Sequence, residues 1–204
     1  MPNYCSNSLT ATDPGFVARV VLLHEDKNFD LFGAFVPIPG PLRSINAGRA
    51  RADDGSIVTL WREVGETLVA VTADEVAANL ALYGATDWYD WSIKHWGTKW
   101  PGSGMTLDFV SDESLVAHFD TAWAPPVPWL AEVASQYPKG GFTLAYAEGG
   151  MGFWGTMRFA DGAVVSEEEF NEGFWSDEVD ADGCPIPSPE VRAHLDLYGL
   201  HSGG

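Results

Sequence analysis

The sequence predicts an α+β domain with a shorter unit appended at its C-terminal end. Three observations support this: an alternating segment near the N-terminus, two pairs of alternating segments typical of β-hairpins, and apolar residues at helical spacing between them. Of the 204 residues, 46% are hydrophobic and 13% aromatic, which is enough for one sizeable core. A disordered acidic chain would lack those aromatic residues, so the composition excludes that class.

The N-terminal part predicts a strand, a helix and a loop. Residues 4–12 mix polar and apolar side chains and are rich in Ser and Thr, which favours a strand. Asp13 and Pro14 supply an N-cap and a proline at the first helical position, and apolar spacing continues the helix to about residue 27. Residues 29–41 contain three prolines and two glycines, which predict an ordered loop.

The middle of the chain predicts a strand followed by two helices. Residues 56–61 favour a strand within a polar, glycine-rich stretch. Thr72 begins a capping box that opens a helix over residues 73–83, and Thr86 is predicted to cap a second helix. A glycine ends each helix. The second helix is aromatic on two sides, so we expect it to be sandwiched between layers.

Two β-hairpins are predicted in the second half of the chain. Residues 105–110 pair with 115–123, and residues 142–148 pair with 151–160. A helix that begins at a group of prolines separates the two hairpins. The order is therefore strand, helix, long insertion, strand, strand, helix, strand, strand. Apart from the insertion, this is the split β-α-β order of a ferredoxin-like sandwich with one extra edge strand.

These elements predict the organisation of the chain. We expect a ferredoxin-like domain over residues 1–162, with a helical insertion at about 28–103. Residues 163–204 are predicted to form an acidic helical appendage packed on this domain. Ser166 begins a capping-box pattern, and Ser188 followed by proline begins a last helix.

The formal net charge of −18 is unevenly distributed. Residues 163–204 contain ten acids and one base, so half of the net charge lies in the last fifth of the chain. Phosphate binding needs clustered Lys and Arg, so a protein that coats a nucleic-acid duplex is excluded. Two interpretations stay open: a solvated surface in a salt-adapted host, and a surface that imitates nucleic acid or docks on a basic partner. In the second, the partner-binding residues are Glu167, Glu168, Glu169, Glu172, Asp177, Glu178, Asp180 and Asp182.

The sequence predicts no cofactor, no metal and no catalytic residues. Residues 178–183 resemble the start of a calcium loop, but the twelfth position is Pro189 where the loop needs a bidentate acid. The five histidines lack zinc-ligand spacing, and the glycine-rich segments lack a phosphate-binding motif. Two cysteines cannot form the disulfide framework of a small secreted domain.

Two weaker candidates for chemistry have ordinary structural explanations. His118 and Asp120 are two residues apart on one strand face, which fits an exposed face or an acid/base pair. Cys5 falls in a predicted central strand, where a small buried thiol is the usual outcome.

We expect a soluble protein of the host-cell cytoplasm. The N-terminus lacks a basic segment followed by an apolar run, and no stretch approaches the roughly 20 apolar residues that cross a bilayer.

Four motifs follow one another along the chain: Met1-Pro2-Asn3-Tyr4-Cys5-Ser6-Asn7, Trp96-Gly97-Thr98-Lys99-Trp100, Thr121-Ala122-Trp123-Ala124-Pro125-Pro126 and Tyr146-Ala147-Glu148-Gly149. In this order they resemble the YubB ferredoxin-like family, whose members are accessory proteins of conjugative plasmids and phages. The resemblance runs from residue 1 to about residue 162, and it departs from the family at Tyr4, where Trp is usual. It implies a fold and a mobile-element setting, and it supplies no catalytic residues.

The predicted topology gathers several of these motif residues near one region of the sheet. Two interpretations stay open: a site that binds a planar or sugar-like ligand by stacking and charge, and a structural lock in which Lys99 pairs with Glu148. The candidate residues are Asn3, Asn7, Lys99, Trp100, Trp123 and Glu148.

The function predicted first is that of a non-enzymatic mobile-element accessory protein. It would bind a host protein with a basic surface through its acidic face, as an anti-defence mimic of nucleic acid, without contacting nucleic acid or membrane itself. One alternative is a small-molecule binder or enzyme that uses the Trp/Lys/Glu cluster. A second alternative is a virion or assembly component.

Overall fold

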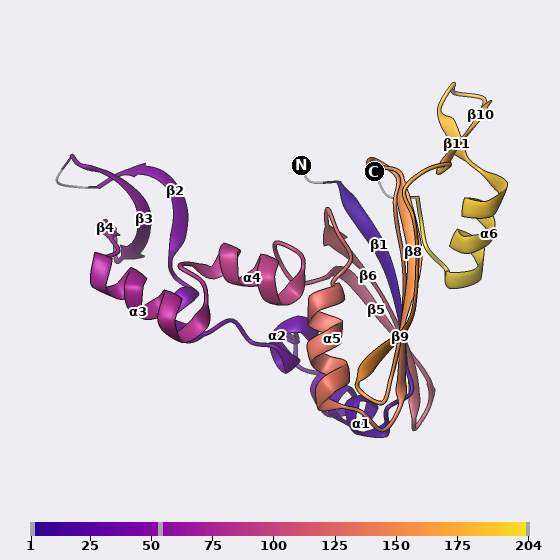
Figure 1. Cartoon of the computed structure of the whole chain (residues 1–204), viewed down its shortest axis with the longest axis horizontal. Coiled ribbons are helices and arrows are strands. Elements are labelled where there is room, and N and C mark those ends of the chain that lie inside the picture. The colour runs from indigo at the N-terminus through magenta and orange to yellow at the C-terminus, as the bar shows by residue number, and fades with distance from the viewer. Residues whose placement is uncertain (1–2, 53–54, 203–204) are drawn as a thin grey trace.

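A computed structural model describes residues 3–52 and 55–202 of the chain (Figure 1). Met1 and Pro2, which begin the first motif, lie outside the described residues. The main body is an antiparallel six-stranded sheet in the order β5-β6-β1-β7-β8-β9. Its strands are β1 (Tyr4–Ala11), β5 (Ser103–Ser111), β6 (Ser114–Ala122), β7 (Gly141–Glu148), β8 (Phe153–Ala160) and β9 (Ala163–Phe170).

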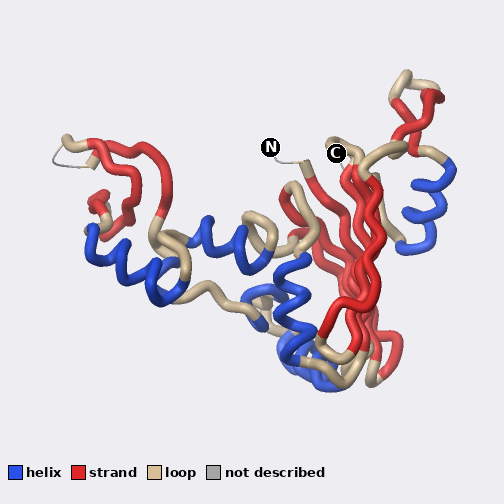
Figure 2. The backbone as a smooth tube through the Cα atoms, in the orientation of Figure 1, coloured by secondary structure: helices blue, strands red, loops and turns tan. Residues whose placement is uncertain are grey.

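Helices lie on both sides of this sheet. In Figures 1 and 2, α1 (Pro14–Leu23), α2 (Leu31–Phe35) and α5 (Val127–Gln136) lie on one side of it, and α6 (Pro189–Tyr198) lies on the other. The Asp13 carboxylate accepts hydrogen bonds from two backbone N–H groups of α1, as its N-cap position predicts. The predicted strand 4–12 and both hairpins are confirmed, and the first helix begins as predicted but ends at Leu23 rather than at about residue 27.

The principal core is aromatic and includes α2, a short helix within a segment predicted as a loop. Phe32 of α2 stacks on Trp129 of α5, with ring centroids 4.6 Å apart. The Trp96 indole N–H donates to the Val36 carbonyl over 2.8 Å. Helix α2 forms because Asp30 caps it and its apolar side chains enter this core.

The insertion is mixed rather than helical. It contains the short 3-10 helix η1 (Gly40–Leu42) and a three-stranded sheet of β2 (Asn46–Arg51), β3 (Ile57–Val64) and β4 (Thr67–Ala70), followed by α3 (Ala73–Tyr83) and α4 (Trp88–Trp96). In Figure 1 the small sheet and α3 form a lobe away from the main sheet. The strand predicted at 56–61 is confirmed as β3. It pairs with β2 on one side and β4 on the other, so the insertion contains a sheet as well as helices.

The two insertion helices follow their capping signals closely. The Thr72–Glu75 capping box is present, and glycines in the left-handed conformation end both helices. The N-cap of α4 is Asp87 rather than Thr86, whose hydroxyl donates to the Asp87 carboxylate over 2.8 Å. Helix α4 buries Trp91 and Trp96 but leaves Tyr89 39% exposed, so the expected burial between layers encloses only part of its aromatic surface.

The C-terminal part departs most from the sequence prediction. The capping box at Ser166 predicts a helix, but residues 163–170 form edge strand β9, paired with β8. Pairing with an exposed strand edge overrides the local helical signal, and Val164 and Val165 favour the strand. Strands β10 (Trp175–Val179) and β11 (Pro185–Pro187) form a hairpin before α6, whose predicted Ser188 cap is confirmed.

Helix α6 packs on the sheet through a second, small apolar cluster of Ala147, Phe174, Val191 and Leu195. Within residues 3–52 and 55–202, none of the helices combines the length and the apolar character that a membrane crossing requires.

Candidate functional site

Three aromatic rings surround the ammonium of Lys99, in the loop between α4 and β5. Its Nζ atom lies 4.6 Å from the ring centroid of Trp100, 5.7 Å from that of Trp123 and 5.9 Å from that of Tyr89. The Trp100 and Trp123 ring centroids are 6.3 Å apart. An ammonium at these distances is attracted to the negative faces of the rings.

The loop that carries Lys99 is held by its neighbours on both sides. Gly97 adopts φ 78°, and a Cβ there would lie 2.6 Å from Cδ of Pro128, so a close approach requires glycine. The buried Thr98 hydroxyl donates to the Ala122 carbonyl and accepts from the Ala122 N–H. Lys99 is therefore placed by the packing of the α4 end against the β6 end.

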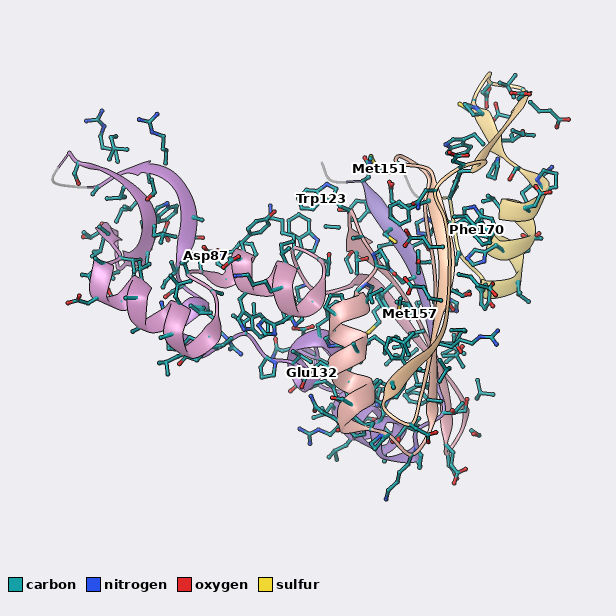
Figure 3. All side chains as sticks on the ribbon, viewed as in Figure 1. Asp87, Trp123, Glu132, Met151, Met157 and Phe170 are labelled. Carbon is teal, nitrogen blue, oxygen red and sulfur yellow. The ribbon has the colours of Figure 1, made fainter. Side chains whose placement is uncertain are left out.

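Trp123 has an unusual backbone conformation for a bulky residue. Its φ is +67°, and its backbone N–H donates to the Asn3 carbonyl over 2.9 Å. The Thr121 hydroxyl donates to the Ala124 carbonyl over 2.7 Å and closes the turn from the other side. The N-terminal segment thus helps to hold the Trp123 ring towards Lys99. Figure 3 shows Trp123 in the region between α4 and the main sheet.

A cavity of about 260 Å³ opens beside these rings, which we call the Lys99 pocket. The Trp88 indole N–H donates to the Asn46 side-chain oxygen over 3.3 Å, so strand β2 of the insertion forms one wall. The residues that line the pocket are Asn46, Ala47, Trp88, Tyr89, Lys99 and Trp123. Trp100 lies against Lys99 from outside this lining.

Glu148 lies in a different environment, so the predicted Lys99–Glu148 pair is wrong. The Glu148 carboxylate is buried and accepts from the backbone N–H groups of Gly150 (3.0 Å) and Met151 (2.6 Å). Among residues 3–52 and 55–202, the side-chain ion pairs are Arg62–Glu75, Asp90–Lys94 and Asp120–His201. Glu148 therefore stabilises the β7–β8 turn, where a Cβ on Gly150 would collide with the Asn3 side chain.

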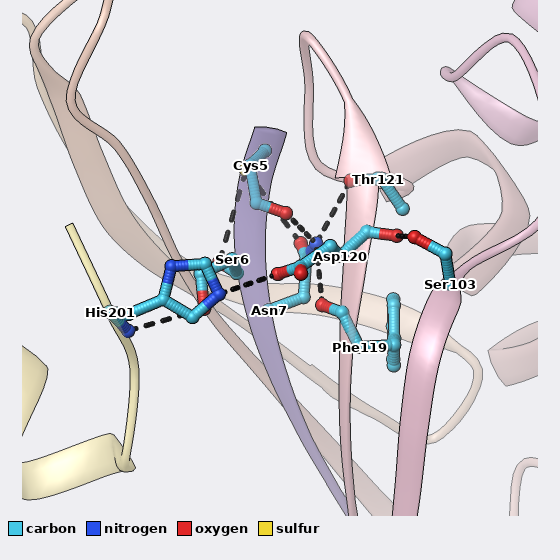
Figure 4. A network of polar contacts seen from close by, with 8 residues as sticks. All are labelled: Cys5, Ser6, Asn7, Ser103, Phe119, Asp120, Thr121 and His201. Atoms are coloured by element: carbon cyan, nitrogen blue, oxygen red, sulfur yellow. Dashed lines mark hydrogen bonds and ion pairs between the residues drawn. The ribbon is translucent and has the colours of Figure 1, made fainter. Parts of the chain in front are cut away.

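Asn7 joins two central strands. Its side-chain amide donates to the Cys5 carbonyl (2.7 Å), the Thr121 hydroxyl (2.9 Å) and the Phe119 carbonyl (3.3 Å), as Figure 4 shows. The side chain is buried between β1 and β6. Of the six candidate residues, Lys99, Trp100 and Trp123 lie at the pocket, whereas Asn7 and Glu148 lie on β1 and at the β7 end. Asn3, just before β1, contacts the first group through its carbonyl, which accepts from the Trp123 N–H.

Asp120 has a partner that the sequence did not predict. His201 Nε2 lies 2.8 Å from Asp120 Oδ1, and the His201 backbone N–H donates to the Ser6 hydroxyl over 3.3 Å (Figure 4). The contact joins the segment after α6 to the sheet and involves residues 81 positions apart. His118 lies on the same strand face, paired in register with Ser8. No local pattern links His201 to Asp120, so sequence reasoning had no signal to use.

Cys5 is buried, as expected for a central strand. Burial, and then the nearby Glu148 carboxylate, raise the pKa of the Cys5 thiol far above its ordinary value. The thiol is therefore protonated at neutral pH, and Cys5 is not an activated nucleophile.

The eight acidic residues proposed for partner binding are all exposed. None of them belongs to an ion pair within the described ranges. Glu169 accepts a hydrogen bond from the Tyr146 hydroxyl (3.0 Å), and Asp180 accepts from the backbone N–H groups of Asp182 and Cys184. We call this set, on β9, β10 and the turns that follow them, the acidic surface.

The structure is that of a mixed α+β protein that contains a ferredoxin-like domain. Residues 95–183 match a family model described as a ferredoxin-like domain in Api92-like protein. A crystal structure of a protein api92 from Yersinia pseudotuberculosis is similar over 85% of this chain and 99% of that one, with 14% identity and a TM-score of 0.45. No curated protein matches the chain. The family match covers Lys99 and Trp123 but not Asn46, which lies in the insertion.

Proposed function

We propose that this protein binds a partner protein with a basic surface through its acidic surface. The observation that carries the proposal is that eight exposed carboxylates on β9, β10 and their turns form no ion pair within the described residues. Unpaired like charges on one surface repel one another, so they favour a ligand that brings positive charge.

The arrangement of β9 supports a regular array of negative charge. Glu167, Glu168 and Glu169 are consecutive on an edge strand whose residues are all exposed. Side chains two positions apart on a strand share a face, so Glu167 and Glu169 are about 6.8 Å apart along it. The β10–β11 hairpin extends beyond the end of the sheet in Figure 1 and carries further acids. In this proposal, the extended row of carboxylates imitates the charge of a nucleic-acid backbone.

We further propose a mobile-element setting and a role in the host cytoplasm, on the basis of the four motifs that resemble the YubB family. A split β-α-β core is supported by the sheet order, in which β6 lies between β1 and β5. In this proposal residues 163–204 form the partner-binding unit, which is joined to the core through the pairing of β9 with β8. In this proposal the protein acts by occupying a basic surface and needs no catalysis.

Substitution tests this proposal better than deletion, because removing residues 163–204 would also remove an edge strand and expose β8. A triple variant, Glu167→Gln, Glu168→Gln and Glu169→Gln, keeps side-chain size and removes three charges. The matched control is Glu25→Gln, Glu63→Gln and Glu66→Gln, which removes three exposed charges elsewhere.

The measurement is affinity capture from host lysate at low and at high salt, followed by binding assays with each purified partner. We expect basic partners to be captured at low salt and released at high salt, because screening weakens contacts between exposed charges. The β9 variant should bind such a partner more weakly than the control variant. Equal binding by both variants would show that the acidic surface is not the binding site.

A further inference from the structure

The charge of Lys99 is not neutralised by a carboxylate, although the chain has 29 acids. Lys94, five residues earlier, forms an ion pair with Asp90 at 2.9 Å, as is usual for a lysine on a helix surface. Lys99 instead lies over three aromatic rings and belongs to no ion pair of the described chain. Ring faces attract an ammonium without cancelling its charge, so its charge stays available to an anion.

The backbone at Trp123 indicates that its ring is placed for a purpose other than core packing. In the described residues, eleven glycines adopt positive φ, and the non-glycine residues that do so are Trp123 and Asp161. Tryptophan is a poor choice for this conformation, and Trp123 is 43% exposed as a residue. Strained residues that expose a large aromatic ring are found at binding sites, where surrounding contacts hold the strain. Here those contacts come from Asn3 and the β6 turn.

The Lys99 pocket has the size and the walls for a flat ring. Trp123 and Tyr89, which is 39% exposed, both line it, together with the half-buried Trp88. Its volume of about 260 Å³ is below the range typical of drug-sized ligands. A single planar ring system can enter it, while a bulky substituent would stay at the rim near the ammonium.

We propose that the Lys99 pocket binds a planar aromatic anion of the nucleoside monophosphate class. The base stacks on the exposed Trp123 ring, and the phosphate pairs with Lys99 Nζ. Stacking on an aromatic side chain tolerates any base, since each base has a π-face. None of the residues that line the pocket belongs to the acidic surface, so nucleotide binding can be tested independently of partner binding.

The overall charge restricts the ligand to a small anion. A net charge of −18 repels a nucleic-acid polymer, which carries many phosphates, far more than a single phosphate. The chain has 11 Lys and Arg against 29 Asp and Glu, so its cations do not offset this repulsion. A free nucleotide is therefore favoured over single-stranded RNA or DNA.

The test titrates the whole protein with AMP and CMP, and in parallel with adenosine, inorganic phosphate and a short single-stranded oligonucleotide. Binding is followed by melting temperature and by tryptophan fluorescence, which stacking on Trp123 should quench. We expect both monophosphates to raise the melting temperature in a saturable way. Adenosine and phosphate alone should bind more weakly, because each makes only half of the contacts.

Two variants and one control assign the binding to this pocket. Lys99→Met should weaken nucleotide binding about tenfold or more, because a charge-assisted contact is lost. Trp123→Asn keeps a residue that tolerates positive φ and should remove both binding and quenching. Lys27→Met, which removes an exposed lysine elsewhere, should bind as the parent does.

Three results would overturn the proposal. One is the absence of any saturable response to AMP or CMP up to about 10 mM. Another is unchanged nucleotide affinity in a folded Lys99→Met variant. The third is tighter binding of the oligonucleotide than of the monophosphates, which would assign the pocket to nucleic acid.

Discussion

Replacing Asn7 with alanine tests whether one buried amide holds the two central strands together. The amide makes three hydrogen bonds, at 2.7, 2.9 and 3.3 Å, and the side chain is 1% exposed. Water cannot easily reach the acceptors once the amide is gone. A hydrogen bond contributes about 1 kcal/mol net, and a buried acceptor left unpaired costs about 1–3 kcal/mol. We therefore expect Asn7→Ala to lower the free energy of unfolding by about 3 kcal/mol.

A second variant, Asn7→Asp, removes the hydrogen-bond donor while nearly preserving the shape of the side chain. Aspartate has nearly the same shape but, when ionised, cannot donate to the Cys5 and Phe119 carbonyls. Burial should raise the pKa of the new carboxyl in the folded state. The folded state then tolerates the protonated carboxyl better than the ionised one. The variant therefore keeps most of its stability below the carboxyl's unfolded pKa of about 4 and loses stability as pH rises above it. We expect the destabilisation to grow from acidic to neutral pH.

The assay is urea unfolding of each variant, read by circular dichroism at several pH values. Asn28→Ala is the control, because Asn28 is exposed, and its cost should stay within about 0.5 kcal/mol. A cost below about 1 kcal/mol for Asn7→Ala would refute the hydrogen-bond argument. So would an Asn7→Asp variant whose stability relative to the parent does not depend on pH.

Three further predictions follow from local geometry. Gly97→Ala should cost about 2 kcal/mol or more in urea unfolding, because positive φ and a proline ring both oppose the new methyl group. Gly65→Ala, with positive φ but open space around it, should cost less. Burial lowers the pKa of His194 in the folded state. Neutral His194 therefore contributes to the free energy of unfolding above its unfolded pKa, and this contribution is lost as pH falls. His194→Gln should reduce the loss of unfolding free energy on acidification. In maleimide labelling, the exposed Cys184 should react in the native state and the buried Cys5 only after unfolding.

Each of these predictions has a clear contrary result. Equal costs for the two glycine variants would mean that the contact with the proline ring is unimportant. An unchanged pH profile for His194→Gln would place the acid-sensitive group elsewhere. Rapid native labelling of both cysteines would show that β1 opens readily.

Salt dependence separates the two explanations of the acidity. If the carboxylates reflect adaptation to salt, the melting temperature should rise with salt because self-repulsion is screened, and no salt-sensitive partner should be captured. If they form a docking surface, neutralising Glu167, Glu168 and Glu169 should weaken partner binding by more than it changes the free energy of unfolding.

Some elements follow directly from short patterns in the chain. The Thr72–Glu75 box and the glycines after α3 and α4 fix helix ends because the capping contacts are made within a few residues. The two hairpins follow from alternation interrupted by turn residues. These signals are local, so they can be read without knowledge of the rest of the fold.

Other features depend on residues that are distant along the chain. The capping pattern at Ser166 is overridden because β8 offers an unpaired edge to residues 163–170. Lys99 and Glu148 share a motif set but lie in separate surroundings, because the end of α4 and the β7–β8 turn face different neighbours. The Asp120–His201 contact exists because the segment after α6 returns to the sheet.

The sequence by itself determined the α+β class, most element boundaries before residue 162 and the acidity of the last fifth of the chain, since composition and local spacing carry that information. Only the tertiary structure decided that the insertion contains a sheet, that β9 extends the main sheet, and that Trp88, Tyr89, Lys99 and Trp123 converge on one pocket. The physical reason is that strand pairing and pocket formation depend on which surfaces meet in space, and neighbouring residues do not specify those meetings.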